Sequence, residues 1–418
     1  MVAVLCVLAA CGDTEDPEQD DDSAATTGGP ATSDGGGSLP GASDGQAGDG
    51  STVGTSGIDD SGDGGSDDGC VSPQCGDEVV CGVFEACGQK VDCGPCQKPT
   101  TIDQLEPEHL VADPTRNRFY VTVQAAAPSF ANELVVIDPA TAVTVDSVFV
   151  GSNPSSMAIS ADHSTLWVGL DGSFEIIEVD LTTPSPTPGP SYPLPPSIQG
   201  DLAAAGPMVV LPGTTDSVAV SLHRFNVSPS FAGVAILDAG VPRPILTPGH
   251  TGAARLTGGP DGWLFGFNNL HTGYEFWAIE VLADGPAQSE YSDLVDGFQT
   301  DITYADGFVF ATSGQVVDVS NPAAPWPAGT FPFSGAVLPQ PELGRVLMLS
   351  PPDFDSATAL RVLSPETFTE VGYAEILAEV GDAYFYDLAT TDGTVLGVIS
   401  LYFNASPRLQ LITNPFPG

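Results

Sequence analysis

Basic residues are scarce in this chain of 418 residues, and long parts of it have none. Ten Lys and Arg stand against 54 Asp and Glu, which gives a formal net charge of −44. Residues 12–69 hold 15 acidic residues and no basic one, and residues 101–418 hold eight Arg and no Lys. Because so acidic a surface repels the phosphates of nucleic acids, we predict no nucleic-acid binding. Cationic partners and divalent counterions suit it better, although acidic residues also serve solubility alone.

The chain also lacks an apolar run long enough to cross a bilayer, which takes roughly 20 residues. Residues 2–10 are uniformly apolar but much shorter. They have the length of the apolar core of a secretory signal peptide. No Lys or Arg precedes them, so we expect that translation starts upstream of Met1.

The apolar run ends in Leu8-Ala9-Ala10-Cys11, which resembles a bacterial lipobox. In a lipobox the small residues fit the signal peptidase, and the cysteine thiol takes a diacylglyceryl group before cleavage. The resemblance implies that residues 1–10 are a lipoprotein signal peptide and that Cys11 is lipidated. It implies a bacterial cell-envelope protein, an outer-membrane lipoprotein anchored in the membrane by its lipid, with the periplasmic or surface-exposed face left open. The alternative is an ordinary signal peptide with a chance cysteine.

Residues 11–69 are dominated, after Cys11, by Asp, Gly, Ser, Thr and Ala. Residues 12–69 contain no aromatic residue, and their only large aliphatic residues are Leu39, Val53 and Ile58. Such a segment cannot bury enough apolar surface to offset the entropy lost on ordering. We therefore predict a disordered acidic linker that tethers the rest of the chain over roughly 40 Å.

Six of the eight cysteines fall within residues 70–100: Cys70, Cys75, Cys81, Cys87, Cys93 and Cys96. Four of them recur every six residues, each followed by glycine. An even count at regular spacing in an exported chain predicts a disulfide framework. We predict a small module with three disulfides, and we leave its connectivity open among the 15 pairings that six cysteines allow.

The last two cysteines form Cys93-Gly94-Pro95-Cys96, which has the spacing of a thioredoxin-like redox site. Such a site needs its first cysteine at a helix N-terminus, where the helix dipole lowers the thiol pKa. The residues that follow, Pro99 and Thr100, are poor helix formers. We interpret the motif as the closing turn of the disulfide module. If reduced it could bind zinc, which an oxidising compartment disfavours.

Residues 101–418 repeat a pattern of β-rich runs at intervals typical of propeller blades. One run recurs at 118–123, 165–170, 217–222, 263–268, 308–313, 345–350 and 394–399. A second run follows each of these, at 133–138, 174–179, 233–238, 275–280, 314–319, 359–364 and 408–413. One such unit cannot bury both of its faces alone. The pattern therefore predicts an all-β fold, a seven-bladed β-propeller over 101–418, preceded by the disordered linker and the disulfide-rich module.

The first unit contains Tyr120-Val121-Thr122, VIDPAT at 136–141 and VGSNP at 150–154. With these motifs it resembles the YVTN-type repeat of bacterial seven-bladed propellers. The second unit also resembles this repeat, whereas the later units keep the strand pattern but lack these motifs. The resemblance implies the same fold throughout and the family signature in roughly the first third of the propeller.

The last unit ends at its third run and lacks a fourth strand. Residues 101–107 align with the fourth run of the first unit, so that Pro107 falls on Pro154. We predict that Thr101–Leu105 closes the last blade from its N-terminal side. The proline-rich segment 183–196 predicts a stiff polyproline loop between the second and third units.

Four polar residues are predicted at the mouth of the central channel, where propellers bind ligands. Aligned innermost strands place Asp301 and Asp387 in one column, with His109 and Gln299 two positions earlier. Two carboxylates, an amide and an imidazole can hold Ca²⁺ or a cationic ligand. They can equally be solvated channel residues without a specific partner, so metal binding stays open.

The sequence contains no Gly-x-Ser-x-Gly nucleophile motif and no His-x-x-x-His zinc motif. We therefore expect a surface-tethered, non-catalytic binding or scaffold propeller that is monomeric and needs no cofactor. Its ligand is an unknown protein, glycan or small molecule. The alternative is an exported propeller enzyme of lactonase or dehydrogenase type, with a metal or cofactor in the central channel.

Overall fold

The computed structural model describes residues 83–86, 89–92, 99–248, 253–270, 272–351, 358–376, 383–402 and 406–417. The chain divides into two units, Met1–Ser66 and Asp67–Gly418, and every described residue lies in the second. The predicted signal peptide, Cys11 with its linker, and all six cysteines of the disulfide module lie outside the described residues. Of that module, the structure describes one antiparallel hairpin, formed by β1 (Val83–Ala86) and β2 (Gln89–Asp92).

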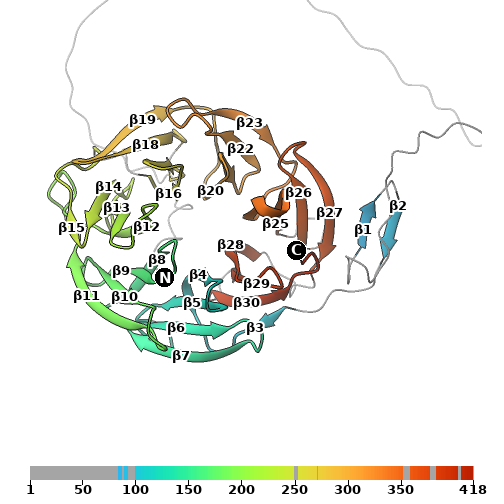
Figure 1. The fold of residues 1–418 in the computed structure, drawn as a ribbon, viewed down its shortest axis with the longest axis horizontal. Coiled ribbons are helices and arrows are strands. Elements are labelled where there is room, and N and C mark those ends of the chain that lie inside the picture. Colours follow the sequence, from blue (N-terminus) through green and yellow to red (C-terminus); the bar gives the residue numbers. More distant parts are fainter. Residues whose placement is uncertain are drawn as a thin grey trace, which may run out of the picture. The chain divides into compact units, whose positions relative to one another are not determined.

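The rest of the described chain forms seven antiparallel four-stranded sheets around a central channel (Figure 1). This is the seven-bladed β-propeller that the sequence predicts. Within blades 1 to 6 the strands follow chain order outwards, so the first strand of each blade borders the channel. One turn of 3-10 helix, η1 (Pro341–Leu343), is the only helix in this part of the chain. No helix among the described residues has the length and apolar character to span a membrane.

The blades are numbered in chain order, with the innermost strand first. Blade 1 contains β4 (Pro107–Asp113), β5 (Arg118–Val123), β6 (Glu133–Asp138) and β7 (Val143–Phe149). Blade 2 contains β8 (Pro154–Ile159), β9 (Thr165–Leu170), β10 (Glu175–Asp180) and β11 (Thr187–Pro193). Blade 3 contains β12 (Ala204–Val210), β13 (Ser217–His223), β14 (Phe231–Asp238) and β15 (Val241–Pro242).

The remaining blades follow the same order. Blade 4 contains β16 (Arg255–Gly258), β17 (Trp263–Phe267), β18 (Phe276–Leu282) and β19 (Gly285–Tyr291). Blade 5 contains β20 (Ile302–Ala305), β21 (Phe308–Ala311), β22 (Gln315–Asp318) and β23 (Trp326–Thr330). Blade 6 contains β24 (Ala336–Gln340), β25 (Arg345–Ser350), β26 (Ala359–Ser364) and β27 (Thr369–Glu375). Blade 7 contains β28 (Ala383–Thr390), β29 (Val395–Tyr402), β30 (Arg408–Thr413) and β3 (Thr100–Thr101).

Among the described residues, the core consists of seven clusters of buried apolar side chains, one in each space between adjacent blades. Because each blade packs against two neighbours, its second strand is buried on both faces. β5 and β9 accordingly have nearly every residue buried, whereas the outermost strands β7 and β11 have no buried residue. Strands buried on both faces read as continuous apolar runs, which is why the sequence marks them so clearly.

The outermost strand of blade 2 corrects one sequence-based expectation. Residues 187–193 lie in the segment predicted to be a polyproline loop, yet they form β11 and pair with β10. An outermost strand needs backbone N–H groups on one side only, so its prolines are tolerated there.

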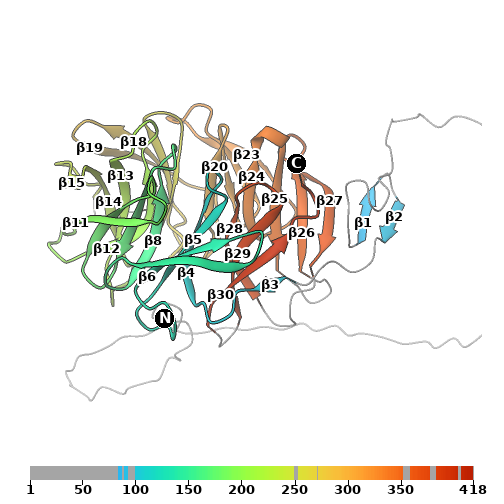
Figure 2. The same cartoon turned by 60° about the horizontal axis from the view of Figure 1, so that its bottom comes forward.

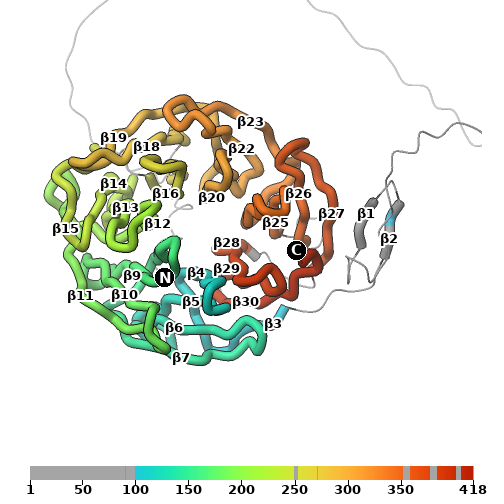
Figure 3. Tube along the Cα trace, viewed as in Figure 1, coloured from blue at the N-terminus to red at the C-terminus, as the bar shows by residue number. Residues whose placement is uncertain are grey.

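The ring is closed by β3, which pairs through Thr100 and Thr101 with β30. Beyond it, the Ile102 N–H donates a hydrogen bond to the Leu409 carbonyl at 3.0 Å. The side chains of Ile102 and Leu105 are both buried in the apolar cluster between blades 7 and 1. The regular strand is shorter than the predicted closing segment because a turn follows Ile102. Figure 2 shows β3 beside β30, and Figure 3 shows the last blade next to the first.

Candidate functional site

One end of the ring carries the segments that lead into the innermost strands and the loops between the second and third strands. We call this end the entry face. Antiparallel strands place both kinds of loop at the same end, since the first strand runs away from it and the second returns. Four long loops of the entry face contain residues 194–203, 224–230, 268–270 with 272–275, and 292–301.

Asp387 and His109, two residues predicted at the channel mouth, lie together where the last blade meets the first. Asp387 occupies an irregular part of β28, where its φ is 55°. Its Oδ2 accepts a hydrogen bond from the Leu110 N–H at 3.1 Å and lies 3.8 Å from Nε2 of His109. Burial raises the pKa of the Asp387 carboxyl, and the facing imidazole acts in the opposite direction.

The other two predicted residues precede β20. Asp301 lies with its Oδ2 3.8 Å from Nε of Arg255. Burial is the largest cause of the raised pKa of Asp387, and the charge of Asp301 raises this pKa further. Gln299 is exposed, with φ of 63°. Among the described residues, it makes no hydrogen bond with the other three predicted residues. The structure thus places His109 and Asp301 within electrostatic reach of Asp387.

Two further carboxyls, Glu108 and Asp171, belong to the same region. Burial raises the pKa of the Glu108 carboxyl, and the charge of Asp387 raises it further. Burial also raises the pKa of Asp171 to about 6, and Glu108 contributes. The Ser155 hydroxyl donates a hydrogen bond to Asp171 Oδ1 at 2.8 Å. Three carboxyls with raised pKa values, from blades 7, 1 and 2, therefore interact near the channel, and such groups gather at functional sites.

Sequence reasoning missed Glu108 and Asp171 for a structural reason. It assigned only every second residue of each innermost strand to the channel. The β4 ladder, however, shifts register between Pro107 and His109, so that Glu108 falls at a bulge. The β8 and β28 ladders shift in the same way. Asp171 follows β9 in a loop, where strand alternation gives no signal.

The entry face also exposes large apolar side chains. On the four long loops they are Ile198, Leu202, Phe225, Val227, Leu270 and Phe298. Phe225 packs edge-on against His223 with ring centroids 4.9 Å apart, and Phe298 packs edge-on against Tyr274 at 5.3 Å. Aromatic groups that are anchored at one edge and exposed at the other are typical of protein-binding surfaces.

The described residues contain no group of three or more His, Cys, Asp or Glu side chains arranged to hold a metal ion. What the channel mouth offers is a set of carboxyls with one imidazole and one guanidinium. Such a set attracts cationic groups, since its carboxylates outnumber its fixed positive charges.

Comparison with solved structures finds the same fold at low sequence identity. "Structure of U3-55K" matches with a TM-score of 0.53 and 14% identity over 77% of this chain and 100% of that chain. The Cps50 (Swd1) β-propeller domain of Myceliophteria thermophila matches with a TM-score of 0.53 and 10% identity over 75% and 99%. The RRP9 WD40 repeats match with a TM-score of 0.51 and 13% identity over 76% and 98%. No protein-family model matches the chain, and no curated protein matches it. At these identities the likeness shows the fold alone.

Proposed function

We propose that this chain is a surface-tethered, non-catalytic propeller that binds a cationic protein partner on its entry face. The observation that carries the proposal is that a group of carboxyls and a set of exposed apolar side chains lie on the same face of the ring. These are the carboxyls Glu108, Asp171 and Asp387, with raised pKa values, and the exposed apolar side chains of the four long loops. Exposed apolar groups supply the buried anchors of an interface. The acidic centre selects positive charge and speeds its approach.

The raised pKa values give this surface a defined dependence on pH. A cationic group beside the carboxyls stabilises their ionised form and so lowers their pKa values. Binding therefore favours the ionised carboxyls, and the affinity for a cation falls as they become protonated. For Asp171, whose pKa is about 6, the affinity falls as the pH drops through about 6.

The tether is a further part of the proposal. We infer that Cys11 carries a lipid and that residues 12–69 link it to the propeller at the bacterial envelope, as in an outer-membrane lipoprotein. The lipobox-like end of the apolar run and the acidic composition of the linker support this. We infer that the six cysteines of residues 70–100 form three disulfides, which is tested by alkylation that finds no free thiol among them. The three sequence motifs of the first unit support a YVTN-type repeat.

The binding claim is tested by calorimetric titration of the full-length chain with a peptide that alternates Lys and Trp. A peptide of equal length that alternates Glu and Trp is the control ligand. We expect saturable binding of the Lys peptide alone, and we expect salt to weaken it because salt screens the attraction that the acidic protein exerts on a cation in solution. Phe225→Ser and Phe298→Ser should each weaken it.

The matched control variant is Val371→Ser, which also removes an exposed apolar side chain but lies on β27, the outermost strand of blade 6. It should leave the affinity unchanged. Equal affinity for the two peptides, or equal losses in Phe225→Ser and Val371→Ser, would contradict the proposal.

A further inference from the structure

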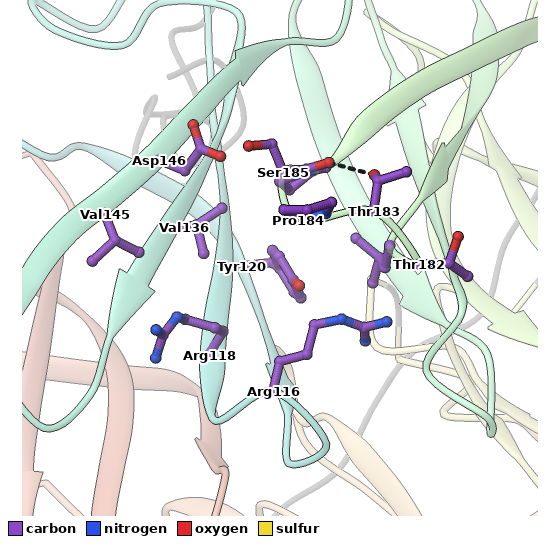
Figure 4. Close-up of a pocket in the computed structure, with 12 residues that line it drawn as sticks. Arg116, Arg118, Tyr120, Val136, Val145, Asp146, Thr182, Thr183, Pro184 and Ser185 are labelled. Carbon is purple, nitrogen blue, oxygen red and sulfur yellow. Dashed lines mark hydrogen bonds between the residues drawn. The ribbon is translucent and has the colours of Figure 1, made fainter.

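The end of the ring opposite the entry face carries a groove of about 610 Å³ between blades 1 and 2. The β4–β5 turn and the β10–β11 loop border it, and the antiparallel order of the strands places both at that end. Figure 4 shows Val145 and Asp146 of β7 on one side of the groove, Thr183 to Ser185 on the other and Tyr120 between them. The volume falls in the range of about 300–1,000 Å³ that small-molecule sites occupy. The groove is therefore a candidate site that is separate from the entry face.

A bulge in β7 shapes the first wall of the groove. The ladder between β6 and β7 shifts register between Val136 and Ile137, so that Val145 has no partner in β6. Val145 and Asp146 therefore both line the groove, although neighbouring residues of a regular strand face opposite sides. Oδ1 of Asp146 accepts a hydrogen bond from the Ser147 N–H at 2.9 Å, whereas its Oδ2 has no hydrogen bond among the described residues. This wall thus offers an exposed apolar side chain beside an available acceptor.

The second wall is the start of the proline-rich segment, and its own hydrogen bonds fix it in place. The N–H and the hydroxyl of Thr182 both donate to Oδ1 of Asp180, at 2.7 and 2.6 Å. The Thr183 hydroxyl donates to the Ser185 carbonyl at 2.6 Å. Between them, the ring of Pro184 fixes the backbone angle φ. A wall that is ordered before binding loses little conformational entropy when a ligand arrives.

Two arginines also line the groove, and a carboxylate of blade 1 holds each of them. Nη1 of Arg116 donates to Oδ2 of Asp113 and to the His163 carbonyl, both at 2.7 Å. Asp113 itself is fully buried. Nη1 of Arg118 lies 3.3 Å from Oδ2 of Asp138. These pairs hold both guanidiniums in place, and their Nε and Nη2 groups make no hydrogen bond among the described residues.

The charges around the groove disfavour a charged ligand of either sign. Both guanidiniums are already paired, and the carboxylate of Asp146 lines the same groove, so no positive charge is left over for an anion. A cation in the groove would lie close to the guanidiniums of Arg116 and Arg118, which repel it. A neutral ligand meets neither penalty.

The polar groups that remain available match a ligand that is rich in hydroxyls. The guanidiniums offer N–H donors, Oδ2 of Asp146 is an acceptor, and the exposed Ser185 hydroxyl can act as either. Each hydroxyl of a sugar both donates and accepts, so a saccharide can satisfy both kinds of group. The apolar surfaces of Val145 and Pro184 suit the C–H faces of a sugar ring.

We propose that the groove between blades 1 and 2 binds a neutral saccharide. A sugar ring packs against Val145 and Pro184. Its hydroxyls donate to the carboxylate of Asp146 and accept from the free N–H groups of Arg116 and Arg118. The site lies at the other end of the ring from the entry face, so it stands independently of the function proposed for that face.

The test is calorimetric titration of the full-length chain with three neutral trisaccharides: maltotriose, cellotriose and chitotriose. We expect saturable binding of at least one of them, with the same affinity at low and high salt, because salt has no ligand charge to screen. The charged probes are the de-acetylated form of chitotriose, which carries ammonium groups, and trigalacturonic acid, which carries carboxylates. Neither should displace the neutral trisaccharide at equal concentration.

Two variants locate the site. Asp146→Ala removes the acceptor and should weaken binding about tenfold, since a hydrogen bond to a charged group is lost. Val145→Trp fills the groove from an exposed position and should abolish binding, while the melting temperature stays near that of the wild type. Val371→Trp, the same replacement at an exposed residue of β27, is the matched control. It should bind the trisaccharide normally, as should Phe298→Ser on the entry face.

Three results would overturn this inference. The first is the absence of saturable binding by all three neutral trisaccharides. The second is displacement of the neutral trisaccharide by a charged one, which would show that the groove selects charge. The third is binding that neither Asp146→Ala nor Val145→Trp alters, which would place the sugar elsewhere. Because Phe298→Ser acts only on the entry face, these results are separate from those that test the proposed function.

Discussion

The carboxylate of Asp387 accepts a hydrogen bond from the backbone N–H of Leu110 at 3.1 Å, although the two residues are 277 positions apart. The bond joins the innermost strands of the last and first blades, whose facing edges have no ladder between them. A similar bond joins blades 4 and 5, where the hydroxyl of Thr257 accepts a hydrogen bond from the backbone N–H of Tyr304 at 3.0 Å. Polar side chains thus satisfy backbone groups along the channel wall, in addition to forming the acidic surface.

Replacement of Asp387 should separate these two roles. Asp387→Ala leaves the Leu110 N–H without its partner, which should lower the free energy of unfolding by about 1–3 kcal/mol. Asp387→Asn keeps an acceptor and removes a buried charge, so it should be at least as stable as the wild type at pH 7. Denaturant unfolding of the three proteins checks this. Equal losses in both variants would show that the charge, not the acceptor, matters for closure.

Asp171 should make stability depend on pH in a defined window. Its pKa is raised from 3.8 to about 6 by burial, so folding favours the protonated form. The resulting cost is absent below the unfolded pKa, grows between about pH 4 and pH 6, and is complete above that range. Asp171→Asn should therefore raise the melting temperature at pH 7.5 and lose this advantage as the pH falls towards 4. A gain that is constant over this range would contradict the assignment.

The closing strand should be necessary for a stable ring. A chain of residues 99–418 keeps β3 and the buried Ile102 and Leu105, and it should unfold cooperatively as a monomer. A chain of residues 107–418 loses two apolar side chains, each worth about 1.5–3 kcal/mol when buried, and leaves Leu409 and Leu411 uncovered. It should melt several degrees lower or aggregate. Equal melting temperatures would mean that the ring closes without β3.

Anchoring should depend on Cys11. When the chain is expressed with a basic segment added before its apolar run, it should partition into detergent with the envelope fraction. Cys11→Ala should be released or remain unprocessed, because the lipid acceptor is gone. Cys6→Ala, in the same apolar run, is the control and should fractionate like the wild type. Identical soluble behaviour of wild type and Cys11→Ala would refute lipidation.

The sequence predicts the inner parts of this fold better than the outer ones, for a physical reason. The second strands, such as Thr165–Leu170, are buried on both faces and form apolar runs. The outermost strands are partly exposed, and each forms ladder hydrogen bonds along only one of its edges. Thr187–Pro193 therefore reads as a polyproline loop although it is a strand. The way in which the ring closes can be predicted from the sequence, because the last repeat unit has no fourth run. Ile102 provides a buried apolar side chain next to the strand that fills this place.

The candidate site is less accessible to sequence reasoning. The pairing of His109 with Asp387 follows from aligning the repeats, because both lie on innermost strands. Glu108 cannot be found by strand alternation, since the register shift in β4 falls on it. The same applies to Asp171, which depends on the path of a loop.

The central claim is that the entry face is the binding surface, and hydrogen exchange tests it most directly. The amides of the full-length chain are measured with and without the peptide that alternates Lys and Trp. We predict slower exchange in residues 194–203, 224–230 and 292–301 and around Glu108 when the peptide is bound. Protection confined to the opposite end of the ring, in the turns at 114–117 and 259–262, would contradict the account.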